Sequence, residues 1–164
     1  MLRALGLAAM ISLLLASTAS AEEHGHEEER HVFAAGGIEI IHPWARAAAA
    51  GEETLVFFEL HNEGQPDRLA GARTDVAEDV HIVGLTLGAE GGEVQEVGVV
   101  DIPAGAFAFD PGGLALELHS LTQTLEQGGH FDLVLQFEGA GAVEIEVAVE
   151  AAGATQHSHA GHSH

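Results

Sequence analysis

Histidine is the residue type whose number and spacing most clearly suggest chemistry in this chain. The 164 residues include 12 histidines and no cysteine. Neutral imidazole is the commonest metal ligand in proteins, and it suits Cu(II), Zn(II) and Ni(II). Histidines at alternating positions of a flexible segment can bring several rings to one ion. Both ends of the chain have this spacing and are predicted to bind metal, through His24, His26, His31, His157, His159, His162 and His164. The alternative for each end is a solvated polar segment without a ligand.

The globular part of the chain between these ends also contains candidate metal ligands. Glu117 and His119 alternate along a predicted strand, so both side chains point to one face of it. Together with a ligand from a neighbouring strand, for which His81 is the best candidate, they could chelate one ion. No site is predicted at the histidines that remain in the body, which are His42, His61 and His130.

The charge balance and the composition exclude several classes of function. Acidic residues number 26 against 5 basic ones, for a formal net charge of −21. Nucleic acid and anionic membranes attract basic surfaces, so neither is an expected partner. The lack of cysteine excludes disulfides, zinc–thiolate sites, iron–sulfur clusters and thiol nucleophiles. No catalytic triad order, nucleophile elbow or phosphate-binding loop is visible, so the chain is not expected to be an enzyme.

The first 21 residues are predicted to be a signal peptide. An arginine precedes the apolar run Ala4–Ala16, and Ala19–Ala21 fits the small-x-small cleavage pattern. The run is short for a membrane span, so we expect cleavage after Ala21, export to the periplasm and no membrane insertion afterwards. An uncleaved membrane anchor is the alternative. Met1 and Met10 are the two methionines of the sequence, so the exported chain would contain no sulfur.

The rest of the chain divides into three predicted parts. Residues 22–31 are an acidic, histidine-rich tail, 32–151 are one globular domain, and 152–164 are a second histidine-rich tail. Both tails are expected to be disordered without a ligand, because they have no apolar side chains to bury.

The globular domain is predicted to be an all-β, antiparallel β-sandwich or barrel. Apolar residues alternate with polar ones, turn residues recur every 8 to 12 positions, and no segment has a helical apolar stripe. The predicted strands are Gly37–Ile41, ending at Pro43, then Thr54–Asn62, Leu69–Arg73, Asp79–Leu87, Glu93–Val100, Ala106–Phe109, Leu114–His119, Phe131–Phe137 and Ala142–Val149.

Several short motifs of the body occur in an order and at a spacing that resemble one known family. They are Ile41–Ala47 (IHPWARA), Phe57–Gly64, Pro66–Ala72, Val80-His81, Ile102–Gly105, Pro111–Gly113 and Leu121–Leu125. Together they make residues 38 to 150 similar to the PCu(A)C, or PCuAC, periplasmic copper chaperones. The resemblance implies a single-domain, cupredoxin-like β-sandwich that binds copper, usually as Cu(I), and hands it to cytochrome oxidase assembly.

The sequence departs from that family at the ligands. The family site resembles a histidine, a downstream methionine and a His-x-Met pair, of which only His81 is matched as it stands. Glu96 lies near the place of the downstream methionine, and Glu117 replaces the methionine of the pair. His119 follows two residues later, where many members have another methionine. The resemblance therefore implies a site of His81, Glu117 and His119, with Glu96 as a further donor.

The expected function follows from this donor set. Thioether ligands select Cu(I), whereas imidazole and carboxylate favour Cu(II) or Zn(II). We expect a periplasmic, copper chaperone-like protein that binds copper as Cu(II) and delivers it to a cytochrome oxidase assembly protein or another recipient. One alternative is a zinc chaperone or buffer on the same fold. The other is a non-catalytic interaction module whose body site has decayed.

Overall fold

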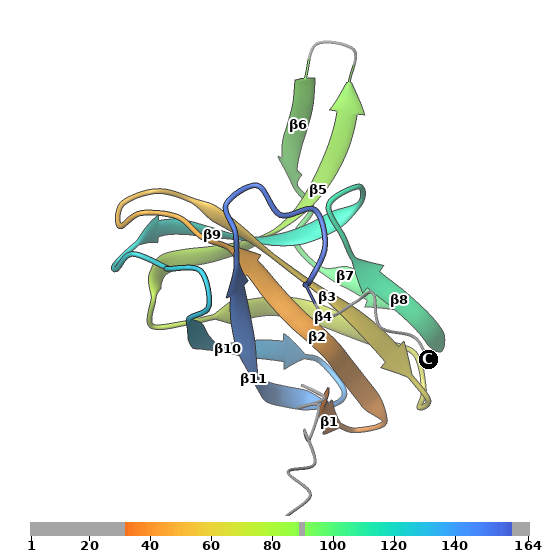
Figure 1. Cartoon of the computed structure of the whole chain (residues 1–164). Helices are drawn as coiled ribbons and strands as arrows, with labels where there is room; N and C mark the ends of the chain where they lie inside the picture. The colour runs from red at the N-terminus through yellow and green to blue at the C-terminus, as the bar shows by residue number, and fades with distance from the viewer. Residues whose placement is uncertain (1–31, 89–90, 159–164) are drawn as a thin grey trace, which may run out of the picture.

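The computed structural model describes residues 32–88 and 91–158. These residues form strands and turns without any helix, and thus contain no helix long and apolar enough to cross a bilayer. The strands are β1 (Val32–Ala35), β2 (Ile38–Arg46), β3 (Thr54–Asn62), β4 (Asp67–Arg73), β5 (Ala77–Gly88), β6 (Gly91–Glu96), β7 (Val100–Ile102), β8 (Gly105–Phe109), β9 (Leu114–Leu121), β10 (His130–Phe137) and β11 (Gly141–Glu150) (Figure 1).

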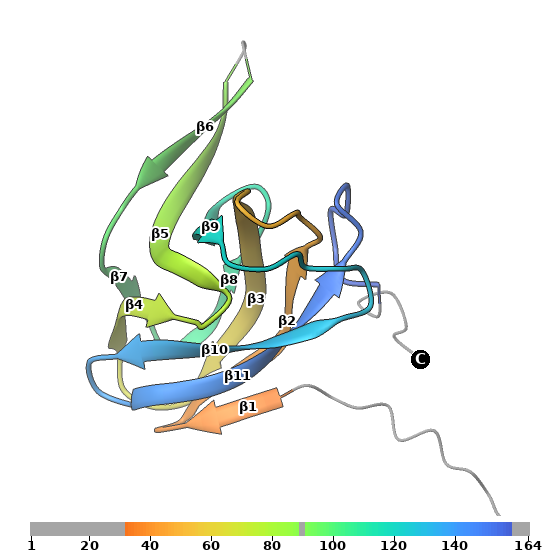
Figure 2. The same cartoon turned by 90° about the vertical axis from the view of Figure 1, so that its left-hand side faces the viewer.

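The strands hydrogen-bond into one curled sheet. Its order is β6-β5-β9-β3-β2-β11-β10-β4-β7, with β1 added to β2 and β8 added to β3. Figure 2 shows the curl, in which β10 and β11 lie across the direction of β3 and β5. The predicted all-β fold is confirmed, and one strand pair departs from the antiparallel arrangement, because β11 pairs with β2 in parallel. The last strand runs back along β2 after its hairpin with β10, and this pairing joins the two halves of the sheet.

The main core lies inside the curl and confirms the alternation predicted from the sequence. Along β10 the side chains of Phe131, Leu133, Leu135 and Phe137 are buried, while the residues between them are exposed or partly buried. The facing strands β2, β3 and β9 contribute further fully buried residues, among them Ile40, Phe58, Leu60, Leu116 and Leu118. Burial of a large aliphatic or aromatic side chain contributes about 1.5–3 kcal/mol. This core fixes which residues of each strand point outward.

A second, smaller core lies on the outer face of the same strands. It consists of Trp44, Phe57, Val83 and Ala115, which come from β2, β3, β5 and β9. The rings of Trp44 and Phe57 lie 4.7 Å apart, centre to centre. The Arg46 guanidinium lies 5.2 Å from the centre of the Phe57 ring. The outer face is therefore partly apolar and requires cover.

The segment after β11 provides part of this cover. Ala154 packs against the outer core, and its carbonyl oxygen accepts a 2.9 Å hydrogen bond from Nε of Arg46. His157 is only 4% exposed. The sequence predicts a C-terminal tail with nothing to bury. For its described part, residues 152–158, this prediction is wrong, because Ala154 packs on the apolar outer face and His157 is buried. The predicted N-terminal tail, 22–31, lies outside the described residues.

Two predicted strand boundaries are wrong, and both errors come from irregular backbone. β2 continues through Pro43 because the β2–β3 register shifts between Ile41 and Trp44, and proline is tolerated at such a bulge. The predicted strand Glu93–Val100 is two strands, because the chain turns at Gly98, whose φ is 66°. This turn takes the chain from β6, beside β5, to β7, beside β4.

Candidate metal centre

The strand register gathers the donors expected in the body onto the outer face of three neighbouring strands. His81 of β5 lies directly opposite Glu117 of β9. Glu96 of β6 lies opposite Val83, which shares a face with His81 because it is two residues away. We call His81, Glu96, Glu117 and His119 the strand cluster. Regular pairing of β6, β5 and β9 places all four side chains together.

The distances within the strand cluster are short. Nε2 of His119 lies 2.8 Å from Oε2 of Glu117, and Nδ1 of His81 lies 3.4 Å from Oε1 of Glu96. The His81 and His119 ring centres are 4.8 Å apart, with the ring planes at 87°. Two imidazoles that share a tetrahedral ion, with bonds of about 2.1 Å, have ring centres about 5 Å apart. The ring separation therefore matches that of a pair of histidine ligands.

Glu53 is a further member of the site that sequence reasoning missed. Its Oε1 lies 2.9 Å from Nδ1 of His119. Glu53 immediately precedes β3, and Thr54 lies opposite Leu118, so one further step along the ladder brings Glu53 beside His119. A ligating histidine usually donates its other ring N–H to a carboxylate, which fixes the tautomer and the ring orientation. The pairing of β3 with β9 was the missing information, since the sequence shows Glu53 only as one of several surface acids.

In this structure the imidazoles of the strand cluster contact carboxylates. In the parts of the chain that the structure describes, no three histidine or acidic side chains are grouped so that they could hold an ion. Contacts to Glu53 and Glu117 occupy both ring nitrogens of His119. An ion would have to displace Glu117 from Nε2, after which that carboxylate and ring would both be free to bind it. Glu53 could stay in place during this exchange.

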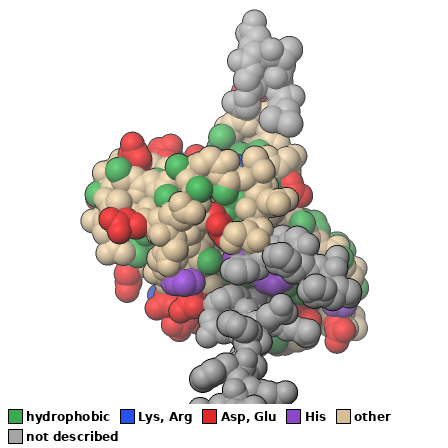
Figure 3. Space-filling view, viewed as in Figure 1, with side chains coloured by type: hydrophobic (Ala, Val, Ile, Leu, Met, Phe, Trp, Pro, Cys, Tyr) green, Lys and Arg blue, Asp and Glu red, His purple; other side chains and the backbone are tan. Residues whose placement is uncertain are grey.

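The strand cluster is partly open to solvent, and its two imidazoles contact the carboxylates of Glu53, Glu96 and Glu117. The side chains of His81 and His119 are 37% and 34% exposed, and that of Glu117 is 15% exposed. Acidic side chains are spread over the face of the molecule in Figure 3, and the whole sequence has a formal net charge of −21. Such a surface raises the local concentration of cations, and the partial exposure allows an ion to enter and leave.

The other histidines differ in their placement. His24, His26, His31, His159, His162 and His164 lie outside the described residues. His61 is half-exposed at the end of β3, with Nδ1 3.9 Å from Glu63, and His130 is exposed at the start of β10. His157 is buried beside His42 at the end of the described chain.

A curled, cupredoxin-like β-sandwich with an imidazole–carboxylate cluster on its outer face defines the class of this protein. The model of the LpqE-like family, described as lipoprotein LpqE-like, matches residues 38–149. The chain belongs to this family, which is of the PCuAC type. The resemblance inferred from the sequence motifs is thereby confirmed.

Solved structures show the same relationship. The copper-bound PCuAC domain from PmoF2 is 31% identical, with a TM-score of 0.62, over 74% of this chain and 98% of that one. The apo PCuAC domain from PmoF1 is 29% identical, with a TM-score of 0.64, over 74% and 99% of the two chains. Cu(I)-DR1885 from Deinococcus radiodurans, 21% identical with a TM-score of 0.54 over 83% and 89%, shows the shared fold alone. No curated protein sequence matches the chain.

Proposed function

We propose that this protein is a copper chaperone-like carrier that binds Cu(II) through His81, Glu96, Glu117 and His119 and delivers it outside the cytoplasm. One observation carries the proposal: two imidazoles 4.8 Å apart, each in contact with a carboxylate, lie on a PCuAC-type fold. A solved neighbour on that fold is copper-bound. The role requires no activated water and no covalent step, so it is a non-enzymatic one.

The oxidation state follows from the donor atoms. Residues 11–164 contain no methionine and no cysteine, so the site can offer only nitrogen and oxygen ligands. Imidazole and carboxylate suit Cu(II), whereas soft thioether ligands select Cu(I). The two carboxylates of the strand cluster also offset the charge of a divalent ion.

Binding needs one local exchange of partners. The Glu117 carboxylate leaves Nε2 of His119, and a proton shared by these two groups is released to solvent. Both groups are then free to bind the ion, while Glu53 keeps its contact with Nδ1 and holds the ring. Nδ1 of His81 and Oε1 of Glu96, 3.4 Å apart, already have the separation of two ligands of one ion, which is about 3.4 Å at a tetrahedral angle. A recipient protein can reach the ion because the imidazoles are partly exposed.

The histidine-rich ends extend this role. We propose that 1–21 is a cleaved signal peptide and that the mature protein acts in the periplasm. His24, His26 and His31 at one end, and His159, His162 and His164 at the other, would gather ions and raise their concentration near the strand cluster. A cytochrome oxidase assembly protein is the recipient that the family resemblance suggests.

The test uses a full-length chain in which these six histidines are replaced by alanine, termed here the tail-substituted chain. It is titrated with Cu(II) and with Zn(II) against a chelator of known affinity. We expect His81→Ala and His119→Ala each to weaken Cu(II) binding at one site, and the double variant to be little worse than either, because the ligands share one ion. His61→Ala is the matched control.

Two results would contradict the proposal. Unchanged Cu(II) binding in both single variants would show that the strand cluster is not the metal site. This result would favour the alternative of an interaction module whose body site has decayed. Zn(II) binding that is tighter than Cu(II) binding would favour the zinc carrier, because the same donors suit that ion.

A further inference from the structure

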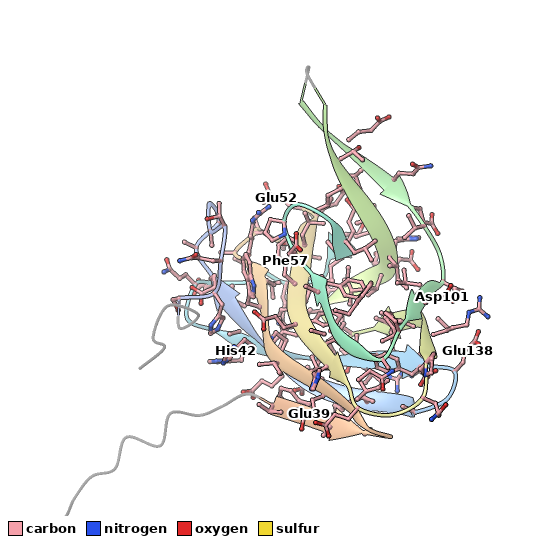
Figure 4. All side chains as sticks on the ribbon, turned by 90° about the vertical axis from the view of Figure 1, so that its right-hand side faces the viewer. Glu39, His42, Glu52, Phe57, Asp101 and Glu138 are labelled. Atoms are coloured by element: carbon pink, nitrogen blue, oxygen red, sulfur yellow. The ribbon has the colours of Figure 1, made fainter. Side chains whose placement is uncertain are left out.

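A second group of imidazole and carboxylate side chains lies where β2, β11 and the C-terminal segment meet. It consists of His42, Glu150 and His157, and we call it the junction cluster. The rings of His42 and His157 are nearly parallel, at 11°, with their centres 5.6 Å apart. Nε2 of His157 lies 3.6 Å from Oε1 of Glu150. Figure 4 labels His42 on the side of the molecule where the C-terminal segment ends.

The burial of His157 is unusual for its place in the sequence. The residue lies seven positions after the last strand, yet its side chain is 4% exposed, and that of Glu150 is 12% exposed. Their 3.6 Å separation is long for a hydrogen bond but close to the distance of about 3.4 Å between two ligands of one ion. The amide and hydroxyl of Ser158 donate hydrogen bonds of 3.0 and 2.7 Å to Oε1 of Glu150 and hold that carboxylate in place.

His42 has a strained backbone. Its φ is 49°, in the left-handed region that residues other than glycine seldom adopt, and it lies in the β2–β3 bulge. Such strain costs about 1–3 kcal/mol and clusters at functional sites, and bulges redirect side chains. The bulge presents the His42 ring to the C-terminal segment.

The junction has room for an ion. Both rings line a cavity of about 290 Å³, together with Trp44 and the acidic residues Glu59 and Asp110. Glu150 is not one of the lining residues and reaches the site through its contact with His157. One water molecule occupies about 30 Å³ in the liquid, so the cavity can hold an ion with water ligands. Ring centres 5.6 Å apart are within reach of one ion once one ring turns toward the other.

We propose that His42, Glu150 and His157 form a second binding site for a divalent ion of the kind that imidazole and carboxylate prefer, Cu(II) or Zn(II). As they stand, the three side chains are not grouped around one point, so a ring of the pair has to turn before both imidazoles and the carboxylate can supply three ligands. Water in the cavity then completes the shell. Because the donors belong to β2, β11 and the C-terminal segment, the ion also fastens that segment to the sheet. This site is independent of the strand cluster and does not require that cluster to bind metal.

The test starts from the tail-substituted chain with His81→Ala and His119→Ala added, which leaves the junction cluster intact. Trp44 is the single tryptophan of the sequence and lines the cavity, so Cu(II) bound there quenches its fluorescence. We expect one Cu(II) per chain and marked quenching. His42→Asn and His157→Ala should each weaken this binding at least about tenfold. Asparagine is chosen because it tolerates a positive φ. His61→Ala is the control and should change nothing.

A second measurement needs no substitution that could disturb folding. When Zn(II) is added to the tail-substituted chain alone, we expect the imidazole nitrogen resonances of His42 and His157 to shift together and to saturate at the same ion concentration. The proposal is overturned if these two residues do not respond to Zn(II). It is equally overturned if Cu(II) binding and quenching are the same with and without His42 and His157.

Discussion

The strand cluster and the junction cluster combine the same two donor types in different ways. The strand cluster takes its side chains from paired strands, with its two rings at 87° and hydrogen-bonding contacts of 2.8 and 2.9 Å to carboxylates. The junction cluster takes its side chains from a bulge, a strand end and the C-terminal segment, with its rings parallel and 5.6 Å apart. One set of donors is held by sheet pairing, and the other depends on how the C-terminal segment packs.

This difference affects the cost of binding. In the strand cluster the backbone is fixed by the ladders of β5 with β6 and β9, so an ion has only to rearrange side chains. In the junction cluster the ion must also keep 151–158 in place, and ordering a segment costs conformational entropy. We therefore expect the strand cluster to bind its ion more tightly, and the junction cluster to couple ion binding to the position of the C-terminal segment.

The largest expected effect concerns the outer core, on which both clusters depend. Phe57 is fully buried, and its ring contacts the Trp44 ring and the Arg46 guanidinium. We expect Phe57→Ala to lower the free energy of unfolding by about 3–5 kcal/mol and to weaken ion binding at both clusters. Chemical denaturation measures the first effect and Cu(II) titration the second. A loss below about 1 kcal/mol would show that the outer core is not an organising element.

Next in size is the loss of a ligand from one cluster alone. In the tail-substituted chain, His81→Ala should weaken Cu(II) binding at the tighter site about a hundredfold, which is the upper end of the affinity losses seen when groups around a metal site are replaced. The quenching of Trp44 fluorescence by the second ion should remain. His42→Asn should have the opposite pattern. Calorimetric titration with parallel fluorescence separates the two. Equal losses at both sites in either variant would mean that the clusters form one coupled site.

A smaller effect is expected at Glu53, which contacts an imidazole but is not proposed as a ligand. Glu53→Gln should weaken Cu(II) binding at the strand cluster about tenfold, because the His119 ring loses its carboxylate partner. Nitrogen NMR of the metal-free protein should show an altered tautomer of His119. Glu93→Gln removes the same charge from an exposed position on β6 and is the control. An equal loss of Cu(II) affinity in this control would show that Glu53 acts only through its negative charge and not through its contact with His119.

The histidine donors also predict a pH dependence that both clusters share. Imidazole must be neutral to bind an ion, so protons compete with the metal. Apparent Cu(II) affinity should fall between about pH 7.5 and 5.5 at both clusters. Competition titrations at several pH values measure this decline. A flat profile for one cluster would show that carboxylates, and not histidines, hold its ion.

The smallest expected effect lies far from both clusters, at the β4–β10 end of the sheet. Burial tends to raise the pKa of Asp67, but hydrogen bonds from the backbone amides of Arg68, Ala140 and Gly139 outweigh this and leave the pKa below its ordinary value. Its ionised form therefore stabilises the fold at neutral pH, and the stabilisation is lost as the pH falls below about 4 through the native pKa.

Asp67→Asn should accordingly lower Tm by a few degrees at pH 7 and by less near pH 3, with no change in Cu(II) binding. Thermal unfolding at the two pH values measures the difference. A destabilisation that is the same at both pH values would show that the charge of Asp67 is not what matters. A change in Cu(II) affinity would link this end of the sheet to the metal sites.

The two clusters also show what sequence alone can predict. Glu117 and His119 share a face because alternation along a strand places them there, and His81 came from the same period-two pattern and the family motifs. Nothing in the sequence marks the positive φ of His42, the bulge that allows β2 to pass Pro43, or the burial of His157 beside His42. These features depend on pairing between distant segments, so the strand cluster was predictable and the junction cluster was not.

The most direct test of the account is the number of imidazoles on a single Cu(II) ion in the strand cluster. The sample is the tail-substituted chain with His42→Asn and His157→Ala added, loaded with one equivalent of Cu(II). Electron spin echo envelope modulation then detects the remote nitrogen of each coordinated imidazole. We predict two imidazoles, falling to one with either His81→Ala or His119→Ala. An unchanged count in these variants, or a chain that binds no Cu(II), would contradict the central claim.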